Sequence, residues 1–142
     1  MTVLDAYAVV AYLRGENAAV EVAELLRSPT WMCAVNVAEV MDQLIRVDSH
    51  DRDEVEVRVA TLVADGMTIH PVSDDLGITA GVLRAKHYSQ RRCNVSLADC
   101  FAAASALILG MPIATADPHL LDLVAAENGQ VHPLAQRINP GQ

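Results

Sequence analysis

Four acidic residues stand where predicted strands give way to predicted helices, in a pattern that suits a divalent cation. They are Asp5 in VLDAY, Glu39 in NVAEV, Asp99 in SLADC and Asp117 in ATADPHL. The apolar run around Asp5 sharpens the question, because a buried carboxylate without a partner is costly. Carboxylate oxygens are ligands for Mg²⁺ and Mn²⁺, whereas no His or Cys falls at the spacing of a zinc site.

Each acid, taken singly, also has a purely structural explanation. Asp5 fits a helix N-cap, and Asp117 followed by Pro118 fits an N-cap with proline at the first helical position. Two further pairs have capping-box spacing or nearly so: Asn36 with Glu39, and Ser96 with Asp99. A cap contributes roughly 1 kcal/mol. Two carboxylates about 5 Å apart repel by roughly 3 kcal/mol at an effective dielectric constant near 20, so convergence of the four acids requires a cation among them.

Alternating strand and helix patterns predict how these acids are positioned. The expected strands are Thr2–Leu4, Trp31–Val35, Met67–Val72, Pro112–Ala114 and, more weakly, Gln130–Pro133. The expected helices are Ala6–Arg14, Ala18–Arg27, Val37–Val47, Arg52–Ala64, Asp74–His87, Leu97–Leu109 and Pro118–Glu127, with Gly110 as a C-terminal stop. This alternation predicts an α/β fold whose mostly parallel sheet is covered on both faces.

The predicted topology brings the acids to one edge of the sheet. Asp5, Glu39 and Asp117 follow strands at their carboxyl ends, and Asp99 opens a helix at the same edge. In open α/β sheets that edge forms the ligand crevice. The four carboxylates are therefore expected to share one crevice with a divalent cation.

Length and composition describe a single compact domain over residues 1–142, with 52% hydrophobic residues and no apolar run long enough to cross a bilayer. Its three widely spaced cysteines argue against a disulfide framework and for reduced thiols in the cytosol. The net charge of −8 disfavours nucleic-acid binding in general. However, four of the ten basic residues crowd into nine positions: Arg84, Lys86, Arg91 and Arg92. This cluster is either a solvated surface or a phosphate contact.

The ordered motifs VLDAY, NVAEV, SLADCFAAASA and IATADPHL resemble PIN-domain ribonucleases, and in particular the VapC toxins of bacterial type II toxin–antitoxin pairs. The resemblance extends from residue 3 to about residue 134. It implies a PIN-like three-layer sandwich with a central, mostly parallel sheet of four to five strands. It also implies an endoribonuclease in which Asp5, Glu39, Asp99 and Asp117 bind Mg²⁺ or Mn²⁺, and a metal-activated water hydrolyses the RNA phosphodiester bond.

The same resemblance implies supporting residues and partners. Thr115 matches the threonine of the family's TxD motif and is expected to orient the acid or a metal-bound water. Tyr7 and Asn36 depart from the small hydroxyl residues common at their positions, which alters the hydrogen bonds around the metal. Arg84, Lys86, Arg91 and Arg92 are expected to help hold RNA. A cytoplasmic homodimer with a cognate antitoxin is expected, using apolar faces of the early helices, Tyr7–Leu13 or Val20–Leu26.

Other protein classes fit less well. A haloacid dehalogenase-type phosphotransferase needs an Asp two residues after its nucleophile, where this chain has Tyr7. A response-regulator receiver needs a late Lys after a strand, and the only Lys, Lys86, has a different setting. The remaining alternative is a non-catalytic PIN-fold protein that acts as a binding or interaction module.

Overall fold

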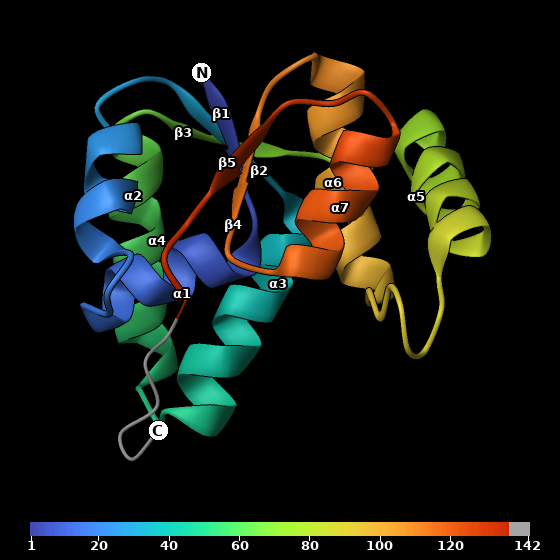
Figure 1. Cartoon of the computed structure of the whole chain (residues 1–142). Helices are drawn as coiled ribbons and strands as arrows, with labels where there is room; N and C mark the ends of the chain where they lie inside the picture. Colours follow the sequence, from blue (N-terminus) through green and yellow to red (C-terminus); the bar gives the residue numbers. More distant parts are fainter. Residues whose placement is uncertain (137–142) are drawn as a thin grey trace.

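Five short parallel strands form one sheet at the centre of the molecule (Figure 1). The structure, a computed structural model, describes residues 1–136. The strands are β1 (Thr2–Leu4), β2 (Thr30–Cys33), β3 (Met67–His70), β4 (Ile113–Thr115) and β5 (Val131–Pro133). Their order is β3-β2-β1-β4-β5, and every neighbouring pair is parallel. The predicted α/β fold with a parallel sheet is confirmed, including the weakly predicted last strand.

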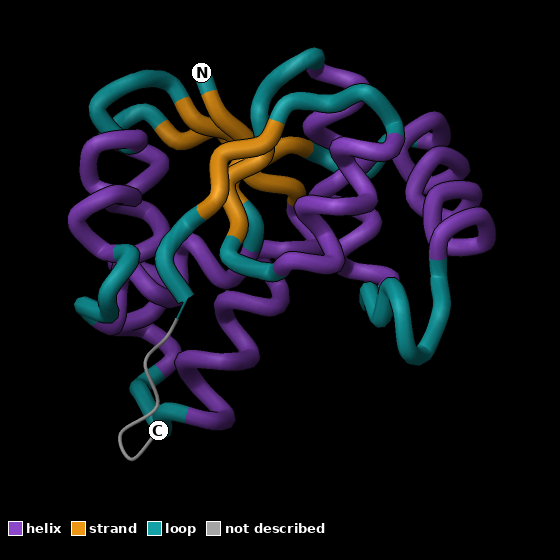
Figure 2. Tube along the Cα trace, in the orientation of Figure 1, coloured by secondary structure: helices purple, strands orange, loops and turns teal. Residues whose placement is uncertain are grey.

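Helices cover both faces of this sheet (Figure 2). They are α1 (Ala6–Arg14), α2 (Ala19–Leu25), α3 (Ala34–Asp42), α4 (Arg52–Ala64), α5 (Asp74–His87), α6 (Leu97–Leu109) and α7 (Pro118–Ala126). Side chains alternate between the faces along each strand. Leu4 therefore belongs to the core formed with α1 to α4, whereas Val3 belongs to the core formed with α5 to α7. The sheet is the middle layer of the sandwich.

Local sequence signals set the ends of the best-predicted helices. Asp5 caps α1 by accepting a hydrogen bond from the Ala8 backbone N–H at 2.9 Å. Ser96 and Asp99 form a reciprocal capping box at the start of α6. Gly110 ends α6 in the left-handed conformation with φ of 64°, which glycine adopts without the steric cost of a Cβ. These caps fix where the chain leaves the sheet edge and enters each helix.

The start of α3 differs from the prediction. The helix begins at Ala34 directly after β2, so the predicted strand end at Val35 and helix start at Val37 are wrong. Asn36 consequently lies inside the helix and is not an N-cap. Its buried amide instead donates to the Glu39 carboxylate and to the backbone carbonyl of Ala98. After Asp42 the helix continues into a π-helical turn, η1 (Gln43–Val47).

The other boundary differences are small. Helix α2 is shorter than the predicted Ala18–Arg27. Within the described part of the chain, no helix has the length and apolar character needed to span a membrane.

Candidate active site

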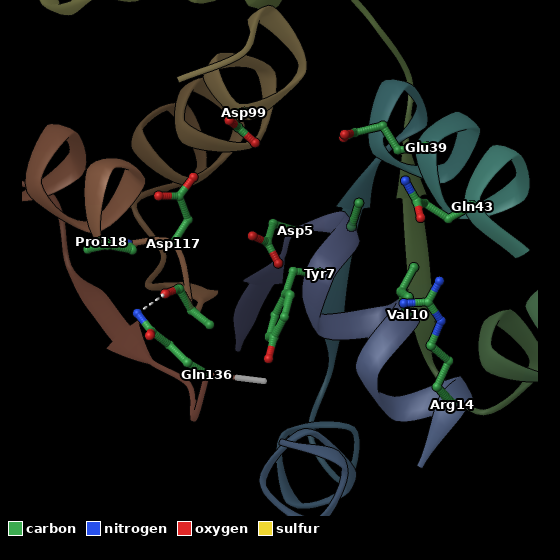
Figure 3. Close-up of a pocket in the computed structure, with 12 residues that line it drawn as sticks. Asp5, Tyr7, Val10, Arg14, Glu39, Gln43, Asp99, Asp117, Pro118 and Gln136 are labelled. Atoms are coloured by element: carbon green, nitrogen blue, oxygen red, sulfur yellow. Dashed lines mark hydrogen bonds between the residues drawn. The ribbon is translucent and has the colours of Figure 1, made fainter. Parts of the chain in front are cut away.

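The four predicted acids line one cavity of about 480 Å³ at the carboxyl edge of the sheet (Figure 3). Figure 3 shows Asp5 between Glu39 on one side and Asp99 and Asp117 on the other. Asp5 and Asp117 are the N-caps of α1 and α7, Asp99 lies in the first turn of α6, and Glu39 lies inside α3, beyond its first turn. The predicted convergence of these acids on one cavity therefore occurs. It coexists with capping roles for Asp5, Asp99 and Asp117, whereas Glu39 caps no helix.

Asp5 is the most deeply buried of the four, with 5% of its surface exposed. Burial raises the pKa of its carboxyl from 3.8 to about 7, against the opposing hydrogen bonds from Thr115 and Ala8. The negative charges of Asp99 and Glu39 raise it further. With no cation nearby, Asp5 therefore keeps its proton to a much higher pH than an exposed carboxyl does. A bound cation would favour its ionised form.

Thr115 links two of the acids through one fully buried hydroxyl. It donates a hydrogen bond to the Asp5 carboxylate, and it accepts one from the Asp117 backbone N–H at 3.1 Å. Asp117 in turn accepts a hydrogen bond from the His119 backbone N–H at 2.9 Å. The threonine of the TxD motif thus fixes the relative position of Asp5 and Asp117.

Glu39 and Asp99 are each held by a separate hydrogen bond. Glu39 Oε1 accepts a 2.8 Å hydrogen bond from Asn36 Nδ2. Asp99 Oδ2 accepts a 2.8 Å hydrogen bond from the Ser96 backbone N–H. Burial is the largest cause of the raised pKa of both acids; the charge of Asp99 adds to it at Glu39, and that of Asp117 adds to it at Asp99. The acids therefore act on one another electrostatically.

Within residues 1–136, no basic side chain pairs with this cluster. Among the ion pairs of residues 1–136, none involves Asp5, Glu39, Asp99 or Asp117. Arg14 lines the same cavity, but its guanidinium binds Asp48 bidentately at 2.7 Å and approaches Glu16 at 3.4 Å. The described cavity therefore carries uncompensated negative charge.

The donor set fits a hard divalent cation held partly through water. The acids offer carboxylate oxygens, which Mg²⁺ and Mn²⁺ prefer. In their present side-chain positions, no three His, Cys, Asp or Glu residues of the range 1–136 are close enough to bind one ion together. Mg²⁺ commonly takes only one or two carboxylates and keeps several waters. Asp5 has the strongest need for such a cation, because its carboxylate is the most desolvated.

The predicted basic cluster does not form one patch at the cavity. Arg84 donates to the Val95 carbonyl and lies over the Tyr88 ring, 4.4 Å from its centroid. Lys86 pairs with Glu127 at 2.8 Å. The other two members, Arg91 and Arg92, lie exposed on the loop between α5 and α6. None of the four lines the acidic cavity.

Several residues that line the cavity were not predicted from the sequence, although helical spacing places some of them on the same helical face as predicted or neighbouring cavity residues. Gln43 lies four residues after Glu39 and therefore on the same helical face. Arg14 and Val10 follow Ala6 at the same interval along α1. Gln136 carries no such signal, because it reaches the cavity only through the pairing of β5 with β4.

Tyr7 and Asn36 are the two departures from the family pattern. Asn36 hydrogen-bonds to one of the four acids, whereas the hydroxyl of Tyr7 does not. Tyr7 lines the cavity, and its hydroxyl donates to the Ala135 carbonyl at 2.9 Å. Asn36 connects Glu39 to the start of α6 through the Ala98 carbonyl. Asn36 thus positions an acid, and Tyr7 holds the C-terminal segment against the cavity.

A sequence model of the PIN domain matches residues 2–126. The chain belongs to the PIN domain family. The order of its four acids along the chain, all lining one cavity, agrees with this assignment. A comparison with curated protein sequences found no significant match.

Solved structures similar to this PIN domain share its fold at low sequence identity. DNA-bound VapBC from Salmonella typhimurium has a TM-score of 0.70 and 14% identity, covering 93% of this chain and 96% of that chain. VapC20 from Mycobacterium tuberculosis, a sarcin–ricin loop cleaving toxin, has a TM-score of 0.68 and 17% identity, covering 89% and 95%. FitAcB from Neisseria gonorrhoeae has a TM-score of 0.64 and 20% identity, covering 92% and 96%. The similarity therefore extends over nearly the whole of each chain.

Proposed function

We propose that this PIN domain is a Mg²⁺- or Mn²⁺-dependent endoribonuclease, the toxin of a type II toxin–antitoxin pair. The observation that carries the proposal is the cavity lined by Asp5, Glu39, Asp99 and Asp117 without a pairing cation among residues 1–136. A divalent cation bound among such acids offsets their mutual repulsion. Capping explains Asp5, Asp99 and Asp117 separately, but it explains neither Glu39 nor the shared cavity.

Asp5 and Asp99 are the proposed direct ligands, with Glu39 and Asp117 acting directly or through water. When bound, a divalent cation polarises the scissile phosphate and lowers the pKa of a coordinated water. Glu39 is the proposed proton acceptor at Oε2, since its Oε1 is occupied by Asn36. Burial raises the pKa of Glu39, which makes it a stronger base than an exposed carboxylate. Thr115 keeps Asp5 and Asp117 in register through its hydroxyl.

The partners are proposed from the similar structures. One similar structure is a toxin–antitoxin complex from Klebsiella pneumoniae, and VapBC from Salmonella typhimurium is solved bound to DNA. A cognate antitoxin is accordingly the proposed partner of this chain, and a cytoplasmic homodimer its proposed state. Helix α2 offers an exposed apolar contact at Val20, which is 78% exposed. The predicted face Val20–Leu26 is proposed as part of an antitoxin or dimer surface.

A cleavage assay with a fluorescent RNA tests the proposed function. Cleavage is expected with Mg²⁺ or Mn²⁺, and it is expected to stop with EDTA and in the Asp5→Asn variant. End mapping should find 5′-phosphate and 3′-hydroxyl products, as the family resemblance implies. Cleavage that survives both controls would belong to another protein or site. RNA binding without cleavage under either cation would instead support the non-catalytic binding module.

A further inference from the structure

The loop between α5 and α6 contains a small hairpin, closed by a bridge between Ser89 and Cys93 (Figure 1). Ser89 and Cys93 exchange two backbone hydrogen bonds, each 3.0 Å long. The Arg92 backbone N–H also donates to the Ser89 hydroxyl at 3.3 Å. This 89–93 hairpin holds Gln90, Arg91 and Arg92 at an exposed tip.

Its two arginines differ from the other basic side chains of residues 1–136. The remaining Lys and Arg side chains in that range each bond to a carboxylate or a backbone carbonyl: Arg14, Arg27, Arg46, Arg52, Arg58, Arg84 and Lys86. Arg91 and Arg92 have no such side-chain bond within the described residues. In a chain with a net charge of −8, two adjacent unpaired guanidinium groups are a local exception.

The imidazole of His119, at the start of α7, fixes this hairpin in place. Its Nδ1 lies 3.1 Å from the Asn94 backbone nitrogen and 3.1 Å from the Arg92 carbonyl oxygen. A ring with bare Nδ1 accepts from Asn94, and a ring that carries the proton there donates to Arg92. Either tautomer therefore bonds to the hairpin backbone. The Cys93 thiol adds a weak hydrogen bond to the His119 carbonyl at 3.8 Å.

The hairpin lies beside two of the cavity acids. The backbone N–H of His119 donates to Asp117, so one residue contacts both the acid and the hairpin. After the hairpin the chain passes directly into the Ser96 cap that holds Asp99. Burial raises the pKa of the Cys93 thiol, and the nearby charges of Asp117 and Asp99 contribute to the increase. The backbone that carries the two arginines therefore lies next to the residues that hold Asp99 and Asp117.

We infer that the 89–93 hairpin binds backbone phosphates of the RNA next to the scissile bond through Arg91 and Arg92, and that His119 is the positioning residue that holds it there. This inference rests on the proposed ribonuclease function. An acidic cavity repels the phosphates on either side of the one that a bound metal ion would neutralise, and arginines on a neighbouring loop would offset that repulsion. The closed hairpin also reduces the ordering cost of binding.

The test measures RNA binding as a function of KCl concentration in the non-cleaving Asp5→Asn chain, by fluorescence anisotropy with a short single-stranded RNA. The test variant adds R91Q/R92Q. The matched control adds R27Q/R52Q, which removes the same charge from two exposed arginines outside this region. The slope of log K against log salt is negative, and each lost phosphate contact makes it shallower by about 0.7 for a single strand. The slope is therefore expected to become shallower by about 1.4 for R91Q/R92Q and to stay unchanged for the control.

His119→Ala separates positioning from general stability, because it keeps the backbone N–H that Asp117 needs. It is expected to weaken RNA binding when the arginines are present and to have no further effect in the R91Q/R92Q background. In the cleaving chain, both changes should raise KM for RNA and leave kcat nearly unchanged. An equal effect of His119→Ala in the two backgrounds would refute the positioning role.

Two outcomes distinguish this inference from the function on which it rests. If the wild-type chain cleaves RNA but R91Q/R92Q has the same salt slope as R27Q/R52Q, the hairpin inference is wrong and the ribonuclease proposal stands. The hairpin would then face a different partner, such as an acidic segment of another protein. If the wild-type chain neither cleaves nor binds RNA, both proposals are wrong.

Discussion

Replacing Asp5 with Asn should stabilise the protein at alkaline pH when no divalent cation is present. Asp5 is 5% exposed, and its ionised carboxylate has no cationic partner within the described residues. Asn removes the charge and preserves the cap, because it is as good an N-cap as Asp and its oxygen can still accept from Ala8. The variant thus isolates the cost of burying the charge.

The size of the effect follows from the pKa of Asp5, which is about 7 in the folded protein and 3.8 ordinarily. Between these values the folded state keeps a proton that the unfolded state has lost, so the free energy of unfolding falls as pH rises, and it levels off above about pH 7. One pH unit corresponds to about 1.4 kcal/mol, so Asp5 contributes a loss of about 2 kcal/mol between about pH 5.5 and 8. The advantage of Asp5→Asn over wild type should grow by that amount.

Urea unfolding followed by circular dichroism in EDTA measures this difference at several pH values. The matched control is Asp65→Asn, which removes an exposed carboxylate at the end of α4 and should differ from wild type by a constant amount. Adding Mn²⁺ should stabilise wild type more than Asp5→Asn, because the ion binds the folded site. A wild-type-to-Asp5→Asn difference that stays constant from pH 5.5 to 8 would refute the assigned burial cost.

Three further substitutions test the site and its support. Asp99→Asn should lower RNA cleavage by about 10²-fold or more in the fluorescent assay while the thermal midpoint stays at or above that of wild type. Thr115→Val removes a hydrogen bond that lowers the pKa of Asp5, so the acid limb of the cleavage pH profile should move to higher pH. Gly129→Ala should cost about 1–3 kcal/mol in urea unfolding, because its Cβ would lie 2.6 Å from Val124 Cγ1. Unchanged cleavage by Asp99→Asn would contradict the first expectation, and an unshifted pH profile for Thr115→Val the second. An unchanged urea midpoint for Gly129→Ala would contradict the third.

Helix ends with short-range signals were predictable from the sequence. The Ser96–Asp99 capping box and Gly110 lie within a few residues of the boundaries that they set, and α6 has the predicted bounds. The same holds for α1 after Asp5. The four acids Asp5, Glu39, Asp99 and Asp117 could also be assigned to one edge of the sheet, because parallel topology brings the carboxyl ends of strands together.

Features that depend on distant contacts were not predictable. Asn36 has capping-box spacing to Glu39, but its amide also bonds to the Ala98 carbonyl, 62 residues away in sequence. That tertiary contact favours helix from Ala34 onward. Similarly, the crowding of basic residues between Arg84 and Arg92 did not reveal that Lys86 is paired with Glu127, the C-cap residue of α7. Sequence proximity indicated a shared patch, whereas folding separated its members.

The spacing of Asp5 and Asp117 is set by two strands hydrogen-bonded side by side, β1 and β4, and not by flexible connections. The Asp5 backbone N–H continues this ladder to the Ala114 carbonyl, and Thr115 closes it with its hydroxyl. Exchange of loops around the cavity can therefore change its surroundings while the distance between these two acids is kept. An engineer who grafts new segments between α5 and α6 would leave the paired strands β1 and β4 unchanged.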